Sequence, residues 1–186
     1  MLGRIIYVMG ASGSGKDSLL TYARKELAGV LRVAFAHRYI TRPAGTGGEN
    51  HVALTPAEFT ARLEAGLFAL NWEGHGFSYG IGIEIDLWME KGVTVVVNGS
   101  RAYLPEARRR YPGLVPVLVE VSIEKMRERL IARGRETREQ VAKRIERHFS
   151  RTWSCEDCLV VNNDGPIHIG GEALLKIIRG LINRAA

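Results

Sequence analysis

The stretch Gly10-Ala11-Ser12-Gly13-Ser14-Gly15-Lys16-Asp17 decides the fold of this chain. An apolar run, Ile5 to Met9, precedes it, and a segment with helical spacing of its apolar residues follows it. Glycines let the backbone curl so that successive N–H groups face an anion, and the helix that follows adds the positive end of its dipole. Strand, glycine-rich turn, lysine and helix in this order predict a phosphate-binding P-loop.

This P-loop is expected to bind ATP, with Lys16 placed as a point charge at the outer phosphates. A P-loop usually carries Ser or Thr after its lysine to bind Mg²⁺, but here Asp17 follows and Ser18 comes one place later. Asp17 is a direct magnesium ligand, a ligand through water, or an acidic residue that favours the first turn of a helix. The expected nucleotide contacts are Gly10, Ala11, Ser12, Gly13, Ser14, Gly15, Lys16, Asp17 and Ser18.

Length and composition indicate one soluble globular domain. The chain has 186 residues with 46% hydrophobic and 25% charged side chains, as ordinary soluble domains do. No apolar run approaches the roughly 20 residues of a membrane span, and the N-terminus leads directly into strand-like sequence without a signal-peptide pattern. We therefore expect a cytoplasmic protein without membrane contact.

The net charge of +6 is compatible with nucleic acid or with a small polyanion as the partner. The arginines are scattered and aromatic residues do not interleave with them, which favours a phosphorylated small molecule over nucleic acid. The two cysteines, Cys155 and Cys158, have the spacing of half a zinc site or of a redox couple. Because the sequence has no second such pair, we expect two reduced cysteines at the start of a strand.

Strand and helix signals alternate along the chain, which predicts an α/β fold: a P-loop NTPase with three layers and a mainly parallel sheet. A ligand is then expected at the carboxyl ends of the strands. Residues 38–82 interrupt the alternation and predict a small inserted lobe within a single domain whose core is 1–37 and 83–186. Strands are predicted over 5–9, 30–36, 93–97, 115–121 and 159–162, and helices over 16–28, 84–91, 102–110, 124–132 and 171–183; the capping boxes at 55–58 and 137–140 predict helices that end near Gly66 and Phe149.

Later segments resemble those of the guanylate kinase family, in the same order along nearly the whole chain. They are Thr41-Arg42-Pro43 with Gly48-Glu49, His75-Gly76-Phe77-Ser78-Tyr79-Gly80, Arg133-Gly134-Arg135-Glu136-Thr137, Lys143-Arg144-Ile145 and Val160-Val161-Asn162-Asn163-Asp164.

The resemblance implies roles for single residues. Arg42 and Tyr79 would bind the phosphate of the acceptor, and Asn163 would lie at the nucleotide. A helical lid over about 133–148 would close over the transferring phosphoryl group, with Arg133, Arg135 and Arg144 as catalytic residues beside Lys16. Planar arginine forks match phosphoryl oxygens in pairs. The further candidates for acceptor binding are Arg38, Glu49, His51, Glu73 and His75; the last four are equally well explained as exposed loop residues.

Departures from the family pattern indicate a different acceptor. Leu70 stands where the family reads guanine with a glutamate, and Ile81 where it uses a hydroxyl residue. The second phosphate-binding arginine is missing, and the acidic end of one strand has become Asn98. The pattern is similar to a bacterial branch of the family that acts in phosphonate breakdown and phosphorylates the 1-phosphate of ribose 1,5-bisphosphate to give phosphoribosyl diphosphate. That acceptor is an ionised phosphate, so no general base is required.

Two other functions stay open at this stage. The chain could be a nucleoside monophosphate kinase with a shifted base pocket, or a non-catalytic guanylate-kinase-like binding module. The P-loop lysine and the lid arginines argue against the module. A different sugar phosphate as acceptor and a homodimeric assembly are also compatible with the sequence.

Overall fold

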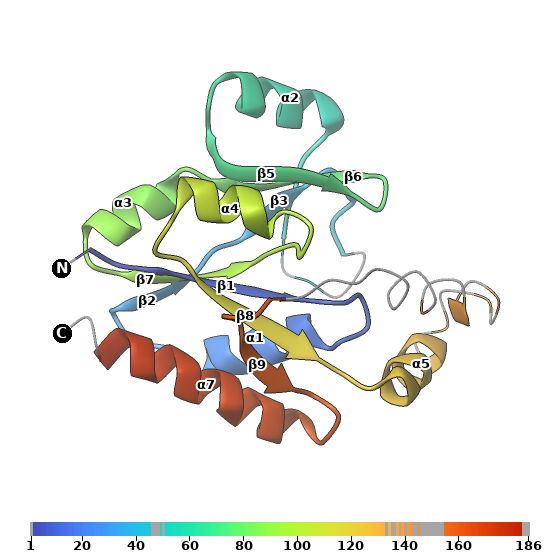
Figure 1. Ribbon diagram of the computed structural model, residues 1–186. Coiled ribbons are helices and arrows are strands. Elements are labelled where there is room, and N and C mark those ends of the chain that lie inside the picture. The colour runs from blue at the N-terminus through green and yellow to red at the C-terminus, as the bar shows by residue number, and fades with distance from the viewer. Residues whose placement is uncertain are drawn as a thin grey trace.

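Five parallel strands form the central sheet in the order β2-β7-β1-β8-β9 (Figure 1). The structure is a computed structural model that describes residues 2–45, 49, 51–132, 134, 137, 139, 141–142, 145 and 155–183. The predicted mainly parallel sheet is confirmed. Its strands are β1 (Ile5–Gly10), β2 (Val33–Phe35), β7 (Thr94–Asn98), β8 (Val115–Glu120) and β9 (Leu159–Asn162).

Helices cover both faces of this sheet (Figure 1). On one face, α1 (Lys16–Glu26) and α7 (Ile167–Asn183) share an apolar cluster with the β1 side chains of Ile6 and Val8. On the other, α3 (Glu84–Glu90) and α4 (Leu104–Arg110) share a cluster with Ile5 and Tyr7. Successive side chains of a strand point to opposite faces, so β1 contributes to both cores. The fifth helix, α5 (Ile123–Ala132), follows β8.

Residues between the two halves of the core form a second, four-stranded sheet in the order β4-β3-β6-β5. Its strands are β3 (Arg38–Ile40), β4 (Val52–Ala53), β5 (Phe68–Gly74) and β6 (Phe77–Gly82). The helix α2 (Pro56–Glu64) lies beside it, and the predicted capping box is confirmed because Thr55 and Glu58 bond reciprocally. The two-residue and three-residue strands β4 and β3 were not predicted, because they are too short to show a period.

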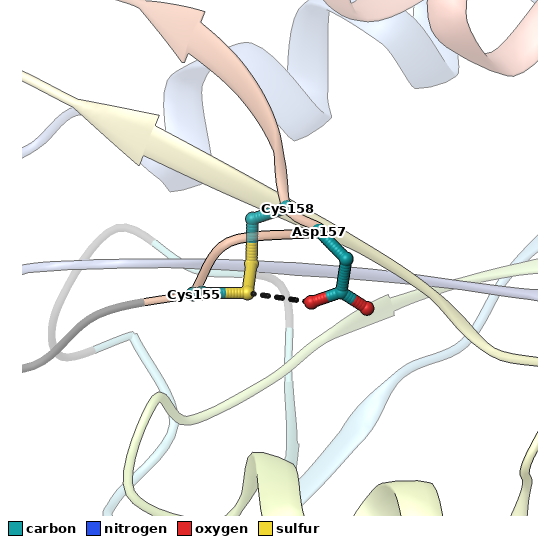
Figure 2. Close-up of side chains that lie close together, drawn as sticks. All are labelled: Cys155, Asp157 and Cys158. Carbon is teal, nitrogen blue, oxygen red and sulfur yellow. Dashed lines mark hydrogen bonds between the residues drawn. A yellow bond between two sulfur atoms is a disulfide. The ribbon is translucent and has the colours of Figure 1, made fainter.

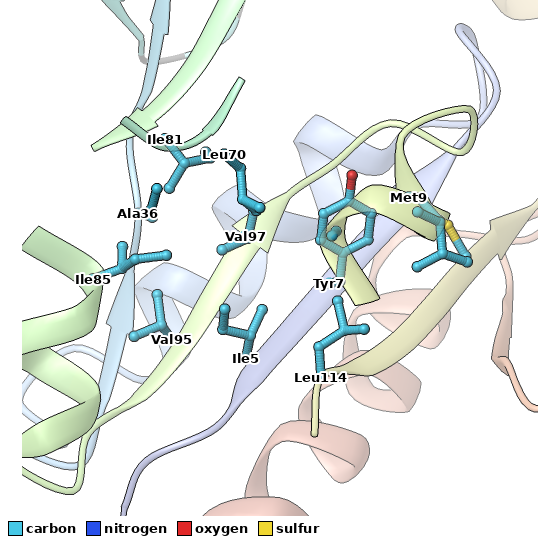
Figure 3. Close-up of a cluster of buried hydrophobic side chains, with 13 residues drawn as sticks. Ile5, Tyr7, Met9, Ala36, Leu70, Ile81, Ile85, Val95, Val97 and Leu114 are labelled. Atoms are coloured by element: carbon cyan, nitrogen blue, oxygen red, sulfur yellow. The ribbon is translucent and has the colours of Figure 1, made fainter. Parts of the chain in front are cut away.

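The second sheet is joined to the first by a common apolar core. Leu70 and Ile81, from β5 and β6, are 0% exposed and belong to one cluster with Val97 of β7 and Ile85 of α3. Figure 3 shows these side chains gathered where the strands of the second sheet meet the central sheet. The hairpin β5-β6 is therefore anchored to the strand that ends at Asn98.

Other differences from the predicted elements lie at their ends. The helix α7 begins at Ile167 rather than at Gly171, and β2 spans three residues rather than seven. Most of the expected lid, 133–148, lies outside the described residues, and so do two members of the second capping box, Arg138 and Gln140. None of the described helices is long and apolar enough to cross a membrane.

Candidate active site

The P-loop lies at the carboxyl end of β1, the central strand of the sheet. Gly13 and Gly15 have φ angles of 94° and 80°, in the left-handed region that glycine adopts without strain. A Cβ on Gly15 would lie only 2.4 Å from Nδ2 of Asn163. The Ser14 hydroxyl is buried and has no hydrogen-bond partner among the described residues. This compact turn, followed at once by α1, has the form that binds phosphate.

Two side chains from distant elements fix the P-loop backbone. Asn163, which is 1% exposed, donates from Nδ2 to the Ser14 carbonyl at 2.6 Å. Arg129 of α5 donates to the same carbonyl at 3.2 Å and to the Asn163 carbonyl at 2.7 Å. Asn163 thus contacts the P-loop, and its expected contact with the nucleotide stays a prediction. Arg129 was missed, because no local pattern separates it from the other arginines of its helix.

Lys16 and Asp17 open α1, and both contact Asn98 at the end of β7. The Lys16 ammonium donates to Asn98 Oδ1 at 2.6 Å and lies 3.3 Å from Asp17 Oδ1. Burial lowers the pKa of Lys16 below the ordinary lysine value, and the Asp17 charge opposes this effect. Burial acts to raise the pKa of Asp17, but the charges of Lys16 and Arg38 outweigh it and lower this pKa. The lowered pKa keeps the Asp17 carboxylate ionised near neutral pH.

One carboxylate, that of Glu49, binds two arginines: Arg38 of β3 and Arg42 of the loop that follows β3. Arg38 donates from Nε and Nη2 to the two oxygens of Glu49, and Arg42 donates from Nη2 to Glu49 at 3.3 Å. The Arg42 Nε–H is buried and has no acceptor among the described residues. A buried guanidinium N–H without a partner is costly, and an anion would satisfy it. Arg38 and Arg42, both expected at the acceptor, are brought together.

Aromatic rings hold Arg38 in place. Its guanidinium lies over the Tyr79 ring, 5.1 Å from the centroid, and Trp72 stacks parallel to Tyr79 at 5.5 Å. Tyr103 packs against Trp72 in turn. Tyr79 therefore lies beside Arg38, another residue expected at the acceptor, whereas Trp72 was missed. Its position in the β5-β6 hairpin, opposite Tyr79, is a signal that could have indicated it.

The remaining predicted residues fall into three groups. The two ring nitrogens of His51 each lie 3.1 Å from a backbone carbonyl, those of Glu49 and Arg42, so His51 braces the arginine-bearing loop. Glu73 and His75 are exposed at the turn end of the β5-β6 hairpin, outside the cluster around Glu49. The lid arginines Arg133, Arg135 and Arg144 lie outside the described residues.

A pocket opens between the P-loop helix and the strands β2 and β7. Its lining includes Asp17, Glu49 and Asn98 together with Arg24 and Phe35. Asp17 of the P-loop helix and Glu49 of the arginine cluster therefore face one hollow.

The two cysteines depart from the expectation. Cys155 and Cys158 form a disulfide with a Cα–Cα distance of 5.4 Å just before β9 (Figure 2), so the prediction of two reduced cysteines is wrong for this structure. Asp157 lies beside them, with Oδ1 3.5 Å from Cys155 Sγ, and Arg108 of α4 pairs with Asp157 at 2.5 Å. The ligand atoms of these three residues lie within 4.8 Å of one another. The sulfur–sulfur bond and the arginine leave no thiolate pair for zinc.

Bacterial proteins of known name are similar to this chain in sequence over most of its length. The chain is 57% identical over 176 residues to ribose 1,5-bisphosphate phosphokinase PhnN of Thiobacillus denitrificans, covering 95% of this chain and 93% of the relative. It is 54% identical over 177 residues to the protein of the same name from Desulfomicrobium baculatum, covering 95% of each. The chain belongs to the ribose 1,5-bisphosphate phosphokinase family. No family model matches it.

The solved structure of guanylate kinase from Anaplasma phagocytophilum has the same fold, with a TM-score of 0.68 at 17% identity over 97% of this chain and 88% of that one. The guanylate-kinase-like fold inferred from the sequence is confirmed. Within this fold, the protein keeps the P-loop, and its Leu70 and Ile81 side chains lie inside the core.

Proposed function

We propose that this protein transfers the γ-phosphoryl group of ATP to the 1-phosphate of ribose 1,5-bisphosphate, giving 5-phosphoribosyl 1-diphosphate and ADP. Family membership at 57% identity supports this reaction. Two observations in the structure carry it: the buried Arg42 Nε–H has no acceptor among the described residues, and Leu70 and Ile81, at the positions that would read a base, are packed in the core. Such a site offers charge for phosphate and no groups for a base.

The residues divide the work of the transfer between two sides. The P-loop N–H groups and Lys16 would hold the outer phosphates of ATP and neutralise charge that develops there. Arg42, whose Nε–H has no acceptor among the described residues, would hold the acceptor phosphate with a two-pronged contact, and Arg38, which Glu49 binds, would add positive charge beside it. An oxygen of the ionised 1-phosphate attacks the γ-phosphorus, and ADP leaves. A phosphate monoester has its second pKa near 6, so no side chain has to remove a proton.

Magnesium fits the donor side. The Asp17 carboxylate is 37% exposed at the mouth of the P-loop and lines the pocket, and carboxylate oxygens are ligands that Mg²⁺ prefers. When bound, the ion would neutralise charge on the phosphates and orient them. Asp17 would hold it directly or through water. The lid arginines Arg133, Arg135 and Arg144, a homodimeric assembly and a cytoplasmic location remain predictions from the sequence.

A guanylate kinase activity is the alternative with a different acceptor. Leu70 and Ile81 are 0% exposed and packed against Val97 and Ile85, so neither position can present a group to guanine. Burying the polar edge of guanine without partners would cost roughly 1–3 kcal/mol per group. A binding module without catalysis would have no use for a half-buried P-loop lysine that lies at the phosphate-binding turn.

An ADP-release assay tests the function directly. Ribose 1,5-bisphosphate, ribose 5-phosphate and GMP are compared at matched concentrations with ATP and Mg²⁺. We expect turnover with the bisphosphate and little with the other two. Efficient phosphorylation of GMP without activity on the bisphosphate contradicts the proposal.

An arginine variant tests the acceptor side. Arg42→Lys should raise the KM for the acceptor and leave the KM for ATP close to that of the wild type, because lysine loses the two-pronged contact. Arg62→Lys is the matched control, since Arg62 belongs to α2 and its guanidinium lies over the ring of Tyr39 and not over that of Tyr79. An unchanged acceptor KM in Arg42→Lys would remove Arg42 from the site.

A further inference from the structure

Asn98 occupies a junction between the two halves of the site. It is the last residue of β7 and pairs in register with Val8 of β1, two residues before the P-loop begins. Its side chain is 6% exposed, and it lines the pocket between Asp17 and Glu49. A buried amide at the carboxyl end of a central strand is placed where ligands of such sheets bind.

Both polar atoms of this amide have hydrogen-bond partners: the oxygen has a donor and the nitrogen has two acceptors. Oδ1 accepts from the Lys16 ammonium at 2.6 Å. Nδ2 donates to Asp17 Oδ1 at 3.0 Å and to Glu49 Oε1 at 3.1 Å. Only an amide offers one acceptor for a cation and two donors for two carboxylates at this size. A carboxylate at position 98 would still meet Lys16 but would stand against both acidic groups.

The bonds join parts of the chain that belong to different substrates. Lys16 and Asp17 are on the nucleotide side. Glu49 is bound by Arg38 and Arg42, the arginines assigned to the acceptor phosphate. Each side has contacts of its own that do not involve Asn98, because Lys16 also pairs with Asp17 and Glu49 also pairs with both arginines. Asn98 therefore sets the position of one assembled side relative to the other.

We propose that Asn98 is a positioning residue for phosphoryl transfer: it aligns Lys16 of the P-loop with the Glu49–arginine cluster, so that donor and acceptor phosphates meet at the right separation. This inference rests on the proposed function. A displacement of about 1 Å between reacting groups can cost about 100-fold in rate. Loss of Asn98 should then reduce the rate of transfer much more than the binding of either substrate alone.

The experiment compares Asn98→Leu with Asn162→Leu, since Asn162 also ends a strand of the same sheet but is exposed. Rates are measured with ATP and ribose 1,5-bisphosphate, and binding of ADP and of the bisphosphate is measured separately by calorimetry. For Asn98→Leu we expect kcat to fall about 100-fold, with both dissociation constants within about threefold of the wild type. Asn162→Leu should resemble the wild type. Loss of both affinities together with a lower melting temperature would show a merely structural role and overturn the inference.

A charge exchange tests the bonding pattern itself. Asn98→Asp should be as inactive as Asn98→Leu, because it places a third carboxylate beside Asp17 and Glu49. Adding Asp17→Asn restores one amide between the two positions. At saturating Mg²⁺, which offsets the loss of the metal-binding carboxylate, the double variant should therefore be at least about tenfold more active than Asn98→Asp alone. Strictly additive effects would overturn the inference.

The experiments distinguish a failure of the proposed function from a failure of the role proposed for Asn98. An inactive wild type overturns the proposed function, and an active wild type matched by Asn98→Leu overturns this inference alone.

Discussion

Asn163 donates a 2.6 Å hydrogen bond from its Nδ2 to the Ser14 carbonyl of the P-loop, although the two residues are 149 positions apart in the sequence. Both residues are buried, so removal of the amide leaves Arg129 as the one side-chain donor to this carbonyl among the described residues. A lost bond of this kind costs about 1–3 kcal/mol. The relationship explains why the end of β9, on the edge of the sheet, matters for a loop that follows the central strand.

We expect Asn163→Ala to raise the KM for ATP about tenfold, which corresponds to about 1.4 kcal/mol, with a smaller effect on the KM for the acceptor. The reason is that the loop N–H groups lose their fixed direction toward the phosphates. Steady-state kinetics with each substrate varied in turn measure the difference. Asn162→Ala, at the exposed neighbouring position, is the control. Equal changes in both KM values would contradict a specific role at the P-loop.

Lys16→Ala should fold like the wild type and lose about 100-fold to 1000-fold in kcat, as when one stabilising group is removed from charge that develops in a transition state. Far-ultraviolet circular dichroism checks the fold, and Lys25→Ala in the last turn of the same helix is the control. Turnover close to that of the wild type in a folded Lys16→Ala protein would exclude a catalytic P-loop.

The same lysine predicts a pH dependence. Burial lowers the pKa of Lys16 in the free protein, so its charge is lost at a lower pH than that of an exposed lysine. Bound phosphates favour the ammonium and should raise this pKa again. The alkaline fall of kcat/KM for ATP, which reports the free protein, should therefore begin at lower pH than the fall of kcat. Coincident alkaline limbs would contradict this reasoning.

The sequence was sufficient for the parts of the site that are local. Glycine spacing, Lys16 and the flanking apolar runs lie within twenty residues, and the structure has the predicted turn. Asn98 and Arg129 could not be derived in this way, because their roles depend on partners that other strands and helices bring to them. The resemblance to guanylate kinases implied that Leu70 and Ile81 stand at base-reading positions and lack base-reading groups. The sequence did not show that Leu70 and Ile81 lie in the core between the two sheets, because this depends on how the sheets pack.

Asp17→Ala should weaken metal binding by about tenfold or more, the scale on which groups around a bound metal act. Binding of Mn²⁺ to the protein–ADP complex, followed by electron paramagnetic resonance, measures this without turnover. The concentration of Mg²⁺ at half-maximal rate should rise in parallel. Glu26→Ala, an acidic residue at the exposed end of the same helix, is the control. If Asp17→Ala binds Mn²⁺ like the wild type, the aspartate serves only the first turn of the helix.

Leu70→Glu should destabilise the protein and leave it without guanylate kinase activity, although it restores the acidic residue found at this place in that family. Leu70 is 0% exposed and packs with Ile81 and Val97 where the two sheets meet, so the new carboxylate would be buried without a partner. The effective penalty for such a burial is several kcal/mol, and we expect the melting temperature to fall by about 10 °C or more. Leu67→Glu, at a position that is 47% exposed just before β5, is the matched control and should melt like the wild type. A stable Leu70→Glu protein that phosphorylates GMP would show that position 70 still faces the acceptor, and that the core assignment of this leucine does not explain the choice of substrate.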